Sequence, residues 1–214
     1  MLSYDYVISL GWNCTPAAKL TDYLGNPPTL PFDYIVSRYL SSVIQLLDNK
    51  CLKLWENIRY EGYFGSYEQI YDLTYSVTSF HDFDKKCSNR QDVLDSYKRK
   101  TERLFRIIGM ANCPLFIRAA HNFGENYLQL SRRLNEIRSN RPYLVLILGN
   151  ENETNLPPNF FFIKHNVMEE YPGNDEEWKE IFNQIELKSY LDNMSNNIIE
   201  NIPEFRRNKI INTM

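Results

Sequence analysis

Apolar residues follow two alternating patterns along the chain. Short uninterrupted apolar runs, typical of strands buried on both faces of a sheet, lie at 4–10, 114–119, 143–148 and 160–164. Apolar residues at helical spacing lie at 15–24, 37–49, 92–108, 125–138 and 178–185. The last helix is expected to continue in pieces toward Ile202. Strands that alternate with amphipathic helices favour a parallel sheet.

Local signals support two helix starts, and one segment is harder to interpret. Thr15 is placed to cap the first helix, with Pro16 in its first turn, and Ser37 is placed to cap the second. The segment 51–79 is rich in aromatic residues and has no clear period. We expect a short helix there, then a loop, then extended structure entering Ser79-Phe-His-Asp-Phe83.

The alternation predicts an α/β fold with a three-layer, mostly parallel sheet flanked by helices, as in Rossmann-like and flavodoxin-like proteins. One domain is expected over 1–202, with 203–214 as a C-terminal tail. Ligands of open α/β sheets bind outside the carboxyl ends of the strands. The residues just beyond each strand are therefore the first place to look for a functional site.

Composition narrows the class of protein. The 214 residues are 43% hydrophobic with a net charge of -3, which permits a core and gives no reason to expect nucleic acid as a partner. The longest apolar run is too short to cross a bilayer, and no signal peptide is recognisable. The four cysteines include no C-x-x-C pair, so we expect free thiols in the cytoplasm, no zinc site and no cofactor. No feature of the sequence indicates an oligomeric state.

The segment Gly11-Trp-Asn-Cys14 connects the first strand to the first helix. Glycine allows a sharp turn, and N–H groups at a helix N-terminus stabilise a thiolate or an oxyanion on an attacked carbonyl. This is a nucleophile elbow in outline, without the G-x-S-x-G pattern. Cys14 is therefore the candidate nucleophile, with Gly11 and Asn13 lining the site. The alternative is that Cys14 is a buried, inert cysteine, which is common.

A thiol nucleophile needs a base, and the chain has three histidines. His81 is preferred, because Asp82 adjoins it and the flanking phenylalanines provide a partly dry pocket. Neighbours in an extended segment face opposite sides, so Asp33 is the expected orienting group and Asp82 a substrate-binding residue. His81 can also be interpreted as an ordinary surface residue.

Three further residues follow or end predicted strands. His121 and His165 each follow a buried strand, and His121 is a candidate for substrate binding. Arg118 ends a buried strand, where a guanidinium needs either an anionic substrate or a carboxylate such as Asp33. The basic residues within 98–106 are interpreted as a solvated helix face.

Several motifs together resemble a known family. They are Val-Ile-Ser-Leu-Gly-x-Asn-Cys14, Pro31-Phe-Asp-Tyr34 with Ser37, Ser79-Phe-His-Asp-Phe83, Tyr97-x-Arg-x-x-x-Arg103, Phe116-Ile-Arg118 and Gly173-Asn-Asp-x-x-Trp178. The combination spans about residues 4 to 182 and resembles a bacterial family of papain-like cysteine peptidases. The resemblance implies a thiol nucleophile at Cys14 and a base at His81.

Three classes of function remain open. The first is a hydrolase or acyltransferase that uses Cys14 on a small-molecule or peptide substrate. The second is a sugar- or nucleotide-handling transferase, for instance in surface-polysaccharide synthesis, in which Cys14 only lines the pocket. The third is a binding domain without chemistry. Hydrogen-bond reach between the Cys14 sulfur and an imidazole nitrogen would favour the first.

Overall fold

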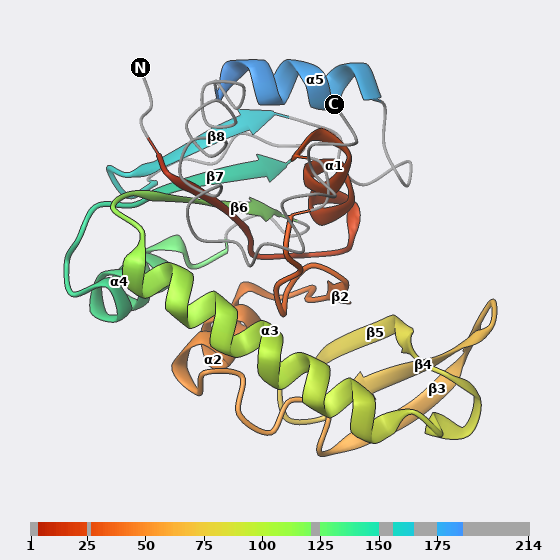
Figure 1. Cartoon of the computed structure of the whole chain (residues 1–214). Helices are drawn as coiled ribbons and strands as arrows, with labels where there is room; N and C mark the ends of the chain where they lie inside the picture. The colour runs from red at the N-terminus through yellow and green to blue at the C-terminus, as the bar shows by residue number, and fades with distance from the viewer. Residues whose placement is uncertain (1–3, 25–26, 121–124, 150–155, 165–174, 186–214) are drawn as a thin grey trace, which may run out of the picture.

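The computed structural model describes residues 4–24, 27–120, 125–149, 156–164 and 175–185, and within them the strands form two four-stranded sheets (Figure 1). The parallel sheet consists of β1 (Tyr6–Ser9), β6 (Pro114–Ala119), β7 (Leu144–Gly149) and β8 (Phe160–Lys164). The antiparallel sheet consists of β2 (Ile35–Val36), β5 (Val77–Phe83), β4 (Tyr67–Asp72) and β3 (Ile58–Phe64). The α-helices are α1 (Thr15–Leu24), α2 (Leu40–Asp48), α3 (Arg90–Met110), α4 (Tyr127–Arg138) and α5 (Asp175–Gln184), and a 3₁₀ turn spans Lys85–Cys87.

The parallel sheet has the strand order β1-β6-β7-β8 and is covered by helices on both faces. Alternate residues of a strand point to opposite faces. In β6, Leu115 and Ile117 therefore join a core cluster with α1 and α5, whereas Phe116 joins the cluster that contains α2, α3 and α4. Burial on both faces explains why these strands are uninterrupted apolar runs. Lys19 of α1 is paired with Asp175, the first residue of α5.

The antiparallel sheet has the order β2-β5-β4-β3 and packs against α3. Strands β3 and β4 form a hairpin whose turn begins at Gly65, which has a φ of +61° that favours glycine. The Trp55 ring lies edge-on to the rings of Phe83 in β5 and Tyr97 in α3, with centroids 5.6 Å apart in both pairs. These aromatic contacts hold α3 against the sheet.

The two sheets meet at the carboxyl end of β1. Trp12 forms a parallel bridge with Val36 of β2. The backbone N–H of Ser37 donates to the Trp12 carbonyl at 2.9 Å, and the Trp12 N–H donates to Ser37 Oγ at 3.2 Å. The segment that precedes Cys14 is therefore also the join between the sheets.

The mixed α/β class and the parallel sheet are confirmed, and β6 and β8 have the predicted bounds. The prediction of one sheet is wrong, because much of the aromatic segment forms β3 and β4 of a second sheet, and a three-layer Rossmann-like arrangement is not confirmed. Ser37 does not cap α2, because Tyr39 takes that position without a side-chain cap. The predicted helix toward Ile202 and the tail at 203–214 lie outside the described residues. Within the described residues, no helix is long and apolar enough to span a membrane.

Candidate functional site

The turn after β1 has an unusual backbone. Gly11 has a φ of +76° and Trp12 a φ of +110°, and the second value is rare for a residue with a side chain. Gly11 also has no room for a side chain, because a Cβ there would lie 2.9 Å from Ser37 Oγ and 3.2 Å from the Phe32 carbonyl oxygen. Strained backbone of this kind clusters at functional sites. The conformation therefore supports a site at this turn.

Cys14 lies immediately before the first residue of α1. Its carbonyl accepts the first helical hydrogen bond, from the Ala18 N–H at 2.8 Å, and Asn13 Oδ1 accepts from the Thr15 N–H at 2.9 Å. The cap position is therefore one residue earlier than predicted, at Cys14 rather than Thr15. Cys14 is a partly exposed residue, and its thiol forms no disulfide. Cys14 thus lies at the start of the helix, directly after the strained turn.

The other three cysteines lie in different surroundings. Burial raises the pKa of Cys51 to about 12 and that of Cys87 to about 11, where the Glu68 carboxylate also contributes. Burial is also the main reason that the pKa of Cys113 is raised, with the nearby Asp5 adding to it. A raised pKa lowers the thiolate fraction at neutral pH. These three thiols are therefore expected to react slowly.

Arg118 lies beneath the turn, and its side chain is fully buried. It pairs with the Glu125 carboxylate at 3.0 Å and donates to Ser37 Oγ at 3.0 Å, to the Ser37 carbonyl at 2.9 Å and to the Leu10 carbonyl at 3.4 Å. The carboxylate that compensates Arg118 is thus Glu125 rather than Asp33. This geometry favours the salt-bridge alternative, in which Arg118 fixes the join between the sheets.

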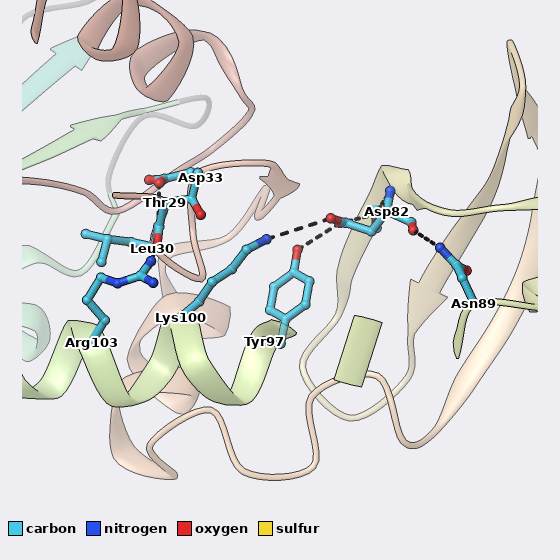
Figure 2. A network of polar contacts seen from close by, with 9 residues as sticks. Thr29, Leu30, Asp33, Asp82, Asn89, Tyr97, Lys100 and Arg103 are labelled. Atoms are coloured by element: carbon cyan, nitrogen blue, oxygen red, sulfur yellow. Dashed lines mark hydrogen bonds and ion pairs between the residues drawn. The ribbon is translucent and has the colours of Figure 1, made fainter. Parts of the chain in front are cut away.

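A second polar cluster lies between β5 and α3, where Asp82 receives contacts from several elements (Figure 2). The Tyr97 hydroxyl donates to Asp82 Oδ2 at 2.8 Å, as does the Ser79 hydroxyl at 2.6 Å. Lys100 Nζ lies 3.8 Å from Asp82 Oδ1, and the Asn89 side chain donates to the Asp82 backbone carbonyl at 2.8 Å. The Asp82 carboxylate therefore connects β5 to α3 through Tyr97 and Lys100.

Asp33 lies near the same cluster and has an unusual protonation equilibrium. Its carboxylate accepts a hydrogen bond from the Leu30 N–H at 2.6 Å. Burial raises the pKa of Asp33 to about 7, although that hydrogen bond and the charges of Lys100 and Arg103 oppose the rise. A carboxyl group that titrates near neutral pH is a candidate for acid–base chemistry. Among the described residues, no hydrogen bond joins Asp33 to His81, the base it was expected to orient.

His81 lies in an irregular part of β5. Glu68 pairs with Phe83 and Ile70 pairs with Ser79, so three residues of β5 lie opposite one residue of β4. Such a bulge redirects side chains. His81 is exposed, and its ring lies edge-on to Phe64, with centroids 5.4 Å apart.

The strand register directs His81 and Cys14 away from each other. Trp12, Val36 and Thr78 form one row across the join of the sheets. The segment from Trp12 to Cys14 starts parallel to β2, whereas β5 runs antiparallel to β2. The chain from Trp12 to Cys14 and the chain from Thr78 to His81 therefore leave this row in opposite directions. No hydrogen bond links the two side chains within the described part of the chain.

The remaining predicted residues add little to this site. His121 and His165 lie outside the described residues. In the part of the chain that the structure describes, no group of histidine, cysteine or carboxylate side chains has the arrangement of a metal site.

Sequence reasoning missed Ser37, Glu125, Tyr97 and Lys100 as members of the polar clusters. Lys100 was assigned to a solvated face, although its side chain is only 12% exposed. The signal was its spacing of three residues from the apolar Tyr97, which places both on one helix face.

Comparison of the chain with protein family models, with curated proteins and with solved structures gives no match. The class of function therefore has to be argued from the residues and their geometry.

Proposed function

We propose that the protein is a cysteine-dependent hydrolase or acyltransferase in which Cys14 is the nucleophile. The observation that carries the proposal is the position of Cys14, a partly exposed residue, at the N-terminus of α1, directly after the strained turn at Gly11 and Trp12. The motif resemblance to papain-like cysteine peptidases supports the same nucleophile. The Rossmann-like interpretation of the parallel sheet and the cytoplasmic location remain parts of this proposal.

The reaction begins when the Cys14 thiolate attacks the carbonyl carbon of an acyl substrate. Backbone N–H groups at the start of α1 stabilise the resulting oxyanion. The tetrahedral intermediate collapses to a thioester as the leaving group takes a proton from the protonated base. Water or a second substrate then attacks the thioester and gives its proton to the base, and the Cys14 sulfur leaves as the thiolate.

Thiol labelling tests this nucleophile directly. The protein is treated at pH 7 with a limiting amount of iodoacetamide, and the labelled residue is located by mass spectrometry. We expect Cys14 to react at least about tenfold faster than glutathione, since a cysteine that serves as a nucleophile is activated for attack. Cys14→Ser should lose the fast phase.

The matched control is Cys113→Ser, which removes another partly exposed cysteine at the opposite end of the parallel sheet and should leave the fast phase intact. A Cys14 thiol that reacts no faster than glutathione would exclude the thiolate mechanism. Turnover that survives Cys14→Ser, together with thermal stabilisation by a nucleotide-sugar, would instead favour the transferase class.

Two histidine variants identify the base. If His81 is the base, as the sequence suggests, His81→Ala should reduce turnover of a reactive acyl ester by about 100-fold. The register of β5 directs His81 away from Cys14, so a second histidine is included as His121→Ala. His121 follows β6, the strand paired with β1, in the sequence. A loss confined to His121→Ala would reassign the base.

A further inference from the structure

The outer edge of the antiparallel sheet is a surface without an assigned role. Strand β3 pairs with β4 on one side, and no strand in the described residues pairs with its other side. Figure 1 shows this edge at the end of the molecule away from the parallel sheet. The unpaired N–H and C=O groups of an edge strand are a template for pairing with another strand.

The side chains of β3 are unusually apolar for an exposed edge. Tyr60 is 50% exposed, Tyr63 is 59% exposed and Phe64 is 55% exposed. The rings of Tyr60 and Tyr63 lie against each other, with centroids 5.4 Å apart. Exposed aromatic clusters are characteristic of interaction surfaces, because their burial gives a large apolar gain.

The charged residues on either side of Tyr60 indicate which strand can pair with the free edge of β3. Arg59 and Glu61 flank Tyr60, and their side chains lie on one face of the strand, where Arg59 Nη2 donates to Glu61 Oε1 at 2.6 Å. If a second β3 pairs antiparallel with the first about Tyr60, Arg59 of each copy lies opposite the partner's Glu61. Opposite charges directly across a strand pair are stabilising. Centring the pair on Arg59 or on Glu61 would instead place like charges together.

The geometry of the sheet limits such pairing to two copies. The other edge strand, β2, has only two residues and is bridged to Trp12, so it offers no second free edge. Pairing through one edge only is isologous and closes after two copies. The bulge between Tyr60 and Gly62 bends β3 and keeps the regular contact short.

We propose that two copies of this chain associate through antiparallel pairing of their β3 strands about Tyr60, which joins their four-stranded sheets across a two-fold axis. A short contact of this kind predicts a dissociation constant of roughly 1–50 µM rather than a permanent dimer.

Charge reversal tests the pairing and its register together. Sedimentation velocity of the full chain, followed up to about 200 µM, should show a concentration-dependent dimer. Arg59→Glu and Glu61→Arg should each weaken dimerisation by at least about tenfold, because each places like charges across the axis twice. The double variant Arg59→Glu/Glu61→Arg should restore it. Circular dichroism controls for folding, and each single reversal should lower the melting temperature by no more than about 4 °C, because it removes only the surface pair between Arg59 and Glu61.

A cross-link tests the position of the axis. Tyr60→Cys places two thiols opposite each other, so mild oxidation should give a covalent dimer. The matched control is Tyr67→Cys on β4, which is exposed but lies away from the edge and should not cross-link. A wild-type chain that is monomeric at about 200 µM, or a dimer unaffected by both single charge reversals, would overturn the proposal.

Discussion

At the residue scale, two networks of buried or partly buried charge connect elements that lie far apart in the sequence. Arg118 uses Glu125 and Ser37 to connect the parallel sheet to the segment after β2. Asp82 connects β5 to α3 through Tyr97 and Lys100. A buried charge is tolerated only when its partners are present. Removal of one partner should therefore cost more than loss of a surface ion pair.

Asp33 gives a prediction about pH. Its pKa is higher in the folded chain, at about 7, than the ordinary value of 3.8, so the folded chain binds this proton more tightly. The contribution of Asp33 to stability is therefore greatest below pH 4 and is lost as the pH rises toward 7. Asp33→Asn removes the titration but retains an acceptor for the Leu30 N–H.

We expect the free energy of unfolding of Asp33→Asn, relative to wild type, to increase by about 2 kcal/mol between pH 5 and pH 8. Urea denaturation at the two pH values measures this difference. A difference between variant and wild type that does not change with pH would mean that Asp33 titrates normally.

At the element scale, the turn between β1 and α1 determines where Cys14 lies. Gly11 there combines a positive φ with close contact to Ser37 Oγ, whereas Gly65 in the β3–β4 turn has a positive φ and nothing within 4 Å. A comparison of substitutions at the two glycines therefore distinguishes the cost of a positive φ alone from the cost of a positive φ with a steric clash.

Gly11→Ala should destabilise the fold by about 2–4 kcal/mol, because it adds a clash to an unfavourable φ. Gly65→Ala should cost only about 1 kcal/mol, since it incurs the conformational cost alone. Urea denaturation of both variants gives the comparison. Equal losses would show that the neighbours of Gly11 move aside easily.

At the scale of the whole molecule, one core cluster contains residues from both sheets. Phe116 of β6 and Phe83 of β5 belong to it, together with Trp55. A second cluster on the far face of the parallel sheet contains Trp178 of α5. The two clusters share strands β6 and β7, so we expect them to unfold together.

The tryptophans make this expectation measurable. Variants that retain only Trp55 or only Trp178, with phenylalanine at the other tryptophan positions, report on one cluster each. Their fluorescence should give denaturation midpoints that coincide with the circular dichroism midpoint of the same variant. A midpoint for the Trp55 reporter that differs from that circular dichroism midpoint would show that the antiparallel sheet unfolds separately.

The apolar pattern of the sequence predicted strand bounds best in the parallel sheet, which is covered on both faces. Strands β6 and β8 lie in the parallel sheet and have the bounds that their apolar runs predicted. Helix α1 also has its predicted span. In β3, by contrast, exposed aromatic residues at Tyr63 and Phe64 obscure the period of two, and the strand was missed. The Gly65-Ser66 turn between two aromatic runs was the available hairpin signal.

The candidate site was predictable in part for a similar reason. Cys14 follows from local order, because a strand, a glycine and a helix start are adjacent in sequence. Partners of a buried charge are not local, since Arg118 finds Ser37 from a different sheet. The direction of His81 depends on a bulge and on strand register, which a single sequence does not display.

The order of strands along the chain has a consequence for synthesis on the ribosome. Strand β1 emerges before the other described strands, yet in the parallel sheet it pairs with β6, and the antiparallel sheet is encoded between them. The hairpin of β3 and β4 needs only neighbouring residues, so it can form while β6 is still untranslated. A nascent chain stalled before Pro114 would therefore expose an apolar β1 strand for chaperones to protect, and the turn carrying Cys14 would acquire its shape only after β6 has been added.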